Sequence, residues 1–162
     1  MSFLKVTTHI ATLAAALLLF AACNPDVIYS ESHAVDERGW NLDDKLTYSI
    51  DISDTQKVYN LFVDLRVARN YPYSNSFLFL RTTFPDNTVA IDTLECPLAY
   101  DDGKWRGKPS GQYIDNRYYF KKHVIFPQSG TYTLDITHGM RDTAIVGIKD
   151  VGLVMTLAKQ GE

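Results

Sequence analysis

The chain has 162 residues, of which 46% are apolar and 22% are charged. This length and composition predict one ordinary globular domain with a continuous hydrophobic core. The formal net charge is −3, and it becomes −4 once a leader carrying Lys5 is removed, so the chain lacks the basic field that nucleic-acid binding requires. Two cysteines are too few for a disulfide scaffold.

The first 22 residues have the three parts of a bacterial secretion signal. Lys5 lies near the start, an apolar run follows over residues 10–20, and two alanines precede Cys23. The apolar stretch is shorter than the roughly 20 residues that a membrane-spanning helix needs. We therefore expect residues 1–22 to be a cleaved signal peptide.

The end of this leader, Phe20-Ala21-Ala22-Cys23, resembles the lipobox of bacterial lipoproteins, although leucine is more usual than phenylalanine at its first position. We expect a diacylglycerol thioether at Cys23, since each buried methylene of the attached chains adds about 0.8 kcal/mol to membrane binding. The alternative is an ordinary secretory signal cut after Ala22. Residues 23–44 are polar and lack a sustained apolar period, so we expect them to be the lipidated N-terminus and a tether.

From residue 45 onward the apolar pattern has period two, which predicts β-strands. Strands are expected at residues 46–52, 58–68, 76–84, 88–94, 117–126, 131–137 and 151–158, with a weaker candidate at 144–148. The glycine- and proline-rich residues 95–115 are expected to form a long ordered loop, and no segment predicts an amphipathic helix. We therefore expect residues 45–162 to form an all-β domain, an antiparallel β-sandwich of the jelly-roll or immunoglobulin-like kind.

The sequence shows no arrangement of residues that is typical of an enzyme. His33, His123 and His138 are dispersed without metal-ligand spacing; the first falls in the expected tether, and the other two are interpreted as solvated strand or turn residues. Cys96 has no neighbour in the sequence that would lower its pKa, so we expect a small buried hydrophobe.

A calcium site from Asp92 and the pair Asp101-Asp102 is a further hypothesis, but Asp101-Asp102-Gly103 is first a turn signature. We expect no catalytic residues, no metal, no cofactor and no small-molecule substrate. A hydrolase with a site assembled from distant residues is kept as a rival hypothesis.

Aromatic residues in the predicted loops are candidates for contacts with a partner or a glycan. Trp105 lies between Lys104 and Arg106, where it either anchors an interface or closes one end of the sandwich. Tyr71 and Tyr73 flank a proline in a turn, and Arg141 follows Gly139-Met140 at another turn.

A polar stripe is predicted on the strand at residues 58–68. Asn60, Asp64 and Arg66 share one face of that strand, which is consistent with simple exposure to solvent.

Several segments of the chain resemble the gliding-motility lipoprotein GldH family of Bacteroidetes. They are Tyr59-Asn60-Leu61 through Leu65-Arg66, Tyr71-Pro72-Tyr73-Ser74-Asn75, Asp92 through Ala99, Gly103 through Gly107, Phe126-Pro127 with Gly130-Thr131-Tyr132, Met140-Arg141, and Gly147 through Gly152. The segments stand in the expected order over nearly all of the mature chain. The resemblance implies a lipoprotein of the cell envelope, linked in gliding members to type IX secretion, and it carries over no catalytic residues.

We therefore expect a non-enzymatic protein that is anchored to a membrane through its N-terminal lipid and binds another envelope protein. We expect it to be located at the outer membrane, facing the periplasm. The alternative is a carbohydrate- or peptidoglycan-binding module that uses Trp105 and the turn at 71–73.

Overall fold

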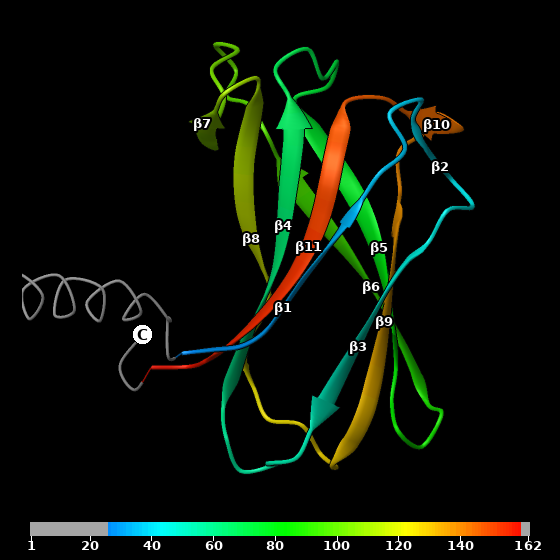
Figure 1. Cartoon of the computed structure of the whole chain (residues 1–162), viewed down its shortest axis with the longest axis vertical. Helices are drawn as coiled ribbons and strands as arrows, with labels where there is room; N and C mark the ends of the chain where they lie inside the picture. The colour runs from blue at the N-terminus through cyan, green and yellow to red at the C-terminus, as the bar shows by residue number, and fades with distance from the viewer. Residues whose placement is uncertain (1–25, 160–162) are drawn as a thin grey trace, which may run out of the picture.

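The computed structural model describes residues 26–159 and confirms the predicted all-β antiparallel sandwich (Figure 1). The predicted signal peptide and Cys23 lie outside the described residues. The strands are, in chain order, β1 (Val27–Ala34), β2 (Trp40–Asn41), β3 (Leu46–Ile52), β4 (Tyr59–Ala68), β5 (Asn75–Thr83), β6 (Val89–Pro97), β7 (Lys108–Ser110), β8 (Tyr113–Val124), β9 (Gly130–His138), β10 (Ala144–Ile145) and β11 (Ile148–Leu157). Within the described residues no helix is long and apolar enough to cross a membrane.

Two sheets form the sandwich. The five-stranded sheet has the order β1-β11-β4-β8-β7, the four-stranded sheet has the order β3-β9-β5-β6, and β2 pairs with β10 in a separate ribbon. Alternate apolar residues of both sheets form one core, in which Val63 of β4, Leu78 of β5 and Ile136 of β9 are fully buried. The Tyr48 hydroxyl on β3 donates a 2.7 Å hydrogen bond to the Val151 carbonyl of β11, which ties the two sheets together.

The structure differs from the expected tether over residues 27–44. β1 pairs with β11 from Val27 to Ala34, and β2 pairs with β10. Trp40 of β2 is only 1% exposed. This corrects the expectation for these residues, because they extend the sheets and contribute to the core.

The expected loop at 95–115 is shorter and more regular than predicted. β6 continues to Pro97, and β8 begins at Tyr113. Between them, residues 98–106 form a hairpin in which Ala99 is bridged to Trp105 and the Tyr100 amide donates to the Lys104 carbonyl at 2.8 Å. We call this segment the 98–106 hairpin.

The strand directions give the sandwich two distinct ends (Figure 1). The loops at 69–74, 98–107 and 139–143 lie at one end, which we call the loop end. The start of β1 and the end of β11 lie together at the other, which we call the terminus end. There the Asp26 carbonyl accepts a 2.9 Å hydrogen bond from the Leu157 amide, and the Asp26 carboxylate lies 3.2 Å from Lys159 Nζ.

A polar bridge closes the open side of the sandwich between β6 and β8. β6 is the outermost strand of its sheet. Its Asp92 lies on the same side as the buried Cys96, and Asp92 Oδ1 is 2.6 Å from Lys121 Nζ of β8. Three residues before Lys121 on β8, the Tyr118 hydroxyl donates a 2.8 Å hydrogen bond to the Pro97 carbonyl at the end of β6. The two sheets are therefore connected here by charge and hydrogen bonds.

Candidate functional site

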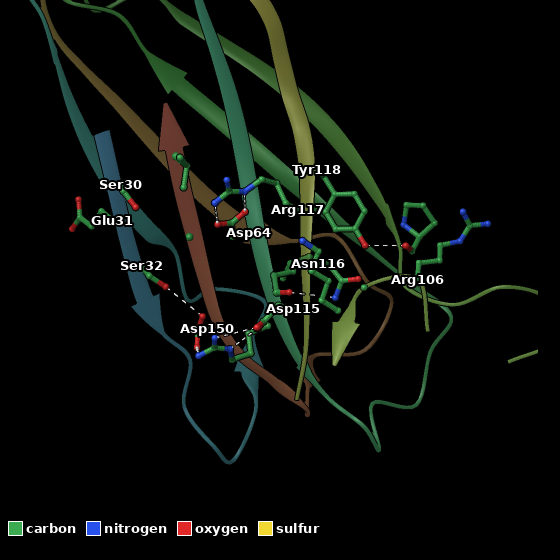
Figure 2. Close-up of a pocket in the computed structure, with 17 residues that line it drawn as sticks. Ser30, Glu31, Ser32, Asp64, Arg106, Asp115, Asn116, Arg117, Tyr118 and Asp150 are labelled. Carbon is green, nitrogen blue, oxygen red and sulfur yellow. Dashed lines mark hydrogen bonds and ion pairs between the residues drawn. The ribbon is translucent and has the colours of Figure 1, made fainter. Parts of the chain in front are cut away.

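A groove of about 720 Å³ lies on the outer face of the five-stranded sheet (Figure 2). Most of the strand residues that line it are outward-facing residues of β1, β11, β4 and β8, because alternate residues of a strand point to the same face. Tyr118 and Pro97 border it at the open side between β8 and β6. Arg106, Gly107 and Lys108, which lead from the 98–106 hairpin into β7, border it on one side. Figure 2 shows Ser30 and Glu31 on one flank, with Tyr118 and Arg106 on the opposite flank.

Small residues keep the floor of the groove open. The strand register places Ser32, Gly152, Asp64 and Arg117 in one row across four strands. A Cβ atom added to Gly152 would lie 3.3 Å from the Asp64 Cβ and 3.7 Å from the Ser32 Cβ. The glycine therefore leaves a space between these two side chains that a larger residue would fill.

Arginine–aspartate pairs form the walls of the groove. Arg117 makes two hydrogen bonds to Asp64, of 2.7 Å from Nε and 2.6 Å from Nη2. Arg66 Nε donates to Asp115 at 2.6 Å, and Arg66 Nη1 lies 3.8 Å from an Asp150 oxygen. The hydrogen bond from Arg66 lowers the pKa of Asp115, so this carboxyl stays ionised. Because these pairs are partly exposed, each contributes at most about 1 kcal/mol to stability, and their main effect is to fix planar hydrogen-bonding groups in place.

The hairpin side of the groove is basic. Among the described residues, Arg106 and Lys108 have no carboxylate within ion-pair distance. The Arg106 guanidinium lies 4.1 Å from the centre of the Tyr100 ring, which is 50% exposed, and Arg106 Nε donates to the Ala99 carbonyl at 3.3 Å. These two cations and the exposed ring are available to a ligand that carries negative charge.

Tyr71 and Tyr73, which we predicted from the sequence as contact residues, lie together at the loop end. Tyr71 is buried, burial raises the pKa of its hydroxyl, and its ring centre lies 5.6 Å from that of Tyr73. Tyr73 is half-buried, and its hydroxyl donates a hydrogen bond to the Asp142 carboxylate, which raises the pKa of Tyr73. Tyr71 therefore offers no exposed ring face to a glycan.

Trp105 and Arg141 lie in the other two loops of this end. Trp105 is half-buried and packs against the core at the base of the 98–106 hairpin. Arg141 is exposed, and no ion pair to it is present in the part of the chain that the structure describes. Ser74 connects the loops, since its carbonyl accepts the Leu98 amide at 2.7 Å.

The residues considered for chemistry do not converge. His138 is completely buried, so the expectation that it is solvated is wrong, whereas His123 is exposed. Cys96 is buried as expected, and burial raises the pKa of its thiol to about 12, so the thiol stays neutral. Asp92 pairs with Lys121, and Asp102 accepts the Lys104 amide within a turn.

No group of three histidine, cysteine, aspartate or glutamate side chains within residues 26–159 is arranged to hold a metal ion. The sequence reasoning missed the groove itself, including Asp115, Arg117, Asp150 and Gly152. The polar stripe of Asp64 and Arg66 on β4 was the signal that pointed to this face.

The fold and this face define an antiparallel β-sandwich with an open, polar, charge-paired sheet surface and a basic border. The family model described as GldH lipoprotein matches residues 27–155. The chain therefore belongs to the GldH lipoprotein family, which confirms the resemblance seen in the sequence.

Two relatives agree with this assignment. The chain is 34% identical over 143 residues to the gliding motility lipoprotein GldH homolog of Christiangramia forsetii, covering 84% of this chain and 87% of the relative. It is 34% identical over 147 residues to the gliding motility lipoprotein GldH of Flavobacterium johnsoniae, covering 86% and 90%. A solved structure, the Yersinia pseudotuberculosis-derived mitogen, superposes with a TM-score of 0.37 at 9% identity over 85% of this chain and 91% of its own, a likeness too distant to bear on function.

Proposed function

We propose that this protein is a lipid-anchored, non-enzymatic component of the cell envelope that binds another envelope protein through the groove and its basic border. The observation that carries the proposal is the contrast between the groove's paired charges and the two unpaired cations beside it. Asp64 and Asp115 are held by arginines, whereas Arg106 and Lys108 face outward without carboxylate partners among the described residues. Such a surface is suited to an acidic segment of a partner.

The anchor in this proposal is a lipid on Cys23, and the location is the outer membrane, facing the periplasm. The names of the two relatives support a role in gliding motility, and we propose that the partner belongs to the gliding or type IX secretion machinery. Trp105 and Arg141 at the loop end are proposed as further contacts.

The test is a crosslink in living cells from a photoreactive residue at Lys108. We expect it to capture a defined envelope protein with an acidic segment. The same residue at Ile91, which is 67% exposed on the outer face of the other sheet, is the matched control and is expected not to capture it.

A charge reversal completes the test. Lys108→Glu is expected to reduce capture from a neighbouring position at Arg106 by at least about tenfold, the effect of losing roughly 1.4 kcal/mol of attraction, with an unchanged melting temperature. Equal capture from positions 108 and 91, or undiminished capture by the Lys108→Glu protein, would contradict the proposal.

A further inference from the structure

We infer that the terminus end of the sandwich is itself a membrane-contact surface, which rests on the phospholipid bilayer and places Ile28 and Ile125 at its interface. The inference rests on the proposed lipid anchor at Cys23. It adds a second contact between protein and membrane, and the occupant it assigns to this surface is the lipid headgroup layer.

The first argument is the shortness of the connection to the anchor. Three peptide steps separate Cys23 from Asp26, and a fully extended chain gains at most about 3.6 Å per residue, so the connection spans no more than roughly 11 Å. Asp26 is fixed to the end of β11 by its hydrogen bond from Leu157 and its ion pair with Lys159. The terminus end therefore cannot move away from the membrane surface while the lipid is inserted.

The second argument is the apolar surface at this end. Ile28 is 47% exposed near the start of β1, and Ile125 is 58% exposed directly after β8. The register connects them: Thr156 of β11 lies between Val27 and Asn60, whose side chain accepts the His123 amide at 2.9 Å. The four strands β1, β11, β4 and β8 thus end side by side, over a width of about 14 Å at the usual strand spacing.

The third argument is the chemistry around the two isoleucines. Lys122 Nζ lies 4.0 Å from the centre of the Tyr119 ring, which is 42% exposed, and the described residues place no carboxylate at ion-pair distance from Lys122. The other lysines of this end are each paired with an aspartate: Lys57 with Asp54, Lys121 with Asp92 and Lys159 with Asp26. An exposed tyrosine with a lysine that extends over it is a combination enriched at membrane–water interfaces, where the ring and methylenes contact acyl chains and the ammonium contacts phosphate.

The experiment uses the processed, lipidated protein in vesicles of phosphatidylethanolamine and phosphatidylglycerol. Ile125→Cys provides a site for a spin label, since the proposed lipid occupies Cys23 and Cys96 is buried. We expect oxygen, which partitions into the bilayer, to relax this label severalfold more effectively than a water-soluble nickel complex. Ile28→Cys is a second, independent position on the same surface with the same expected result.

Val146→Cys and Leu42→Cys are the matched controls, because both side chains are exposed, at 55% and 46%, and lie beside the 139–143 connection of the loop end. Their labels are expected to respond mainly to the nickel complex. A lipidated protein whose labels at 28 and 125 respond as those at 42 and 146 do would overturn the inference and leave the anchor intact. Shielding from both relaxing agents would also overturn it, in favour of a protein contact. Mass spectrometry of the processed protein checks the anchor itself. A measured mass without the lipid on Cys23 would contradict the anchor and, with it, this inference.

Discussion

His138 is the residue whose position departs most from its expected exposure. It ends β9 and follows the inward positions Tyr132, Leu134 and Ile136, so the period-two pattern extended by one residue would have placed it in the core. Its ring lies edge-to-face with Trp40 at a centroid distance of 5.6 Å. Burial lowers the pKa of His138 below its ordinary value of 6.5, so the folded protein holds the neutral imidazole.

This burial predicts a contribution to acid sensitivity. Because the folded pKa lies below the unfolded one, the stabilisation is complete above about pH 6.5 and is lost as the pH falls toward the folded pKa, at no more than about 1.4 kcal/mol per pH unit for one proton. We expect His138→Phe to lose less unfolding free energy than the unchanged protein between pH 7.5 and 5.5 in urea titrations. Thr137→Val, at the neighbouring position of β9, changes no titratable group and is the control that keeps the original slope. Equal slopes for the His138→Phe and unchanged proteins would contradict the prediction.

Gly107 sets the position of the 98–106 hairpin against β8. A Cβ atom there would lie 2.5 Å from the Asp115 carbonyl oxygen and would also clash with the Asn116 side chain. Asn116 cannot move aside without breaking its hydrogen bonds to the Leu65 and Ile114 carbonyls, of 3.3 and 3.2 Å.

We therefore expect Gly107→Ala to lower the free energy of unfolding by about 1–3 kcal/mol, as overpacking usually does, and to displace the basic border of the groove. Chemical denaturation measures the first effect. Gly103→Asn is the control, since Gly103 has open space around it and asparagine tolerates its positive φ of 80°. A Gly107→Ala protein as stable as the control would show that the backbone can shift at no cost.

At the scale of elements, β1 is the longest of the strands that were not predicted from the sequence. Its inward positions are Tyr29, Glu31 and His33, so it lacks the alternating apolar residues that identified β3 and β4. Its stability comes from pairing with β11 rather than from an apolar face. Pattern reasoning detects burial, and an edge strand with a mixed inner face buries too little to be seen.

Hydrogen exchange tests the pairing of β1. We expect amides of residues 29–34 that donate to β11 to exchange far more slowly than those of the connection at 53–58, because strand pairing protects amides and this connection is outside the sheets. Mass spectrometry of peptides from both segments gives the comparison within one sample. Rapid exchange throughout residues 27–44 would restore the tether that the sequence suggested.

Most other strands were predicted because each carries its own period-two signal. The groove could not be predicted in the same way, since Ser32, Asp64, Arg117 and Gly152 become one row only through the pairing of four strands. Register between distant strands is not encoded in any single segment. From the sequence, the polar stripe predicted on β4 contained Asp64 and Arg66 of the groove, whereas the groove residues on β1, β8 and β11 were not identified.

At the scale of the whole molecule, the two ends of the sandwich differ in chemistry. The loop end joins three connections through Tyr73, Asp142 and Ser74, and the groove's basic border begins beside it. The terminus end holds the start of β1, the end of β11 and the lysine–aspartate pairs. The strands run between these ends, so a contact made at one end determines the direction in which the other end points.

The ion pair between Asp92 and Lys121 bears on how neighbouring copies of the protein associate on a crowded membrane. Anchored proteins meet one another in two dimensions at high local density, where an unpaired strand such as β6, with exposed Val89 and Ile91, invites edge-to-edge polymerisation. A strand added to β6 from a neighbouring copy would have to set its inner side chains beside an ion pair that already fills the gap to β8. We therefore expect the Asp92–Lys121 pair to disfavour edge-to-edge association of neighbouring copies on a densely populated surface.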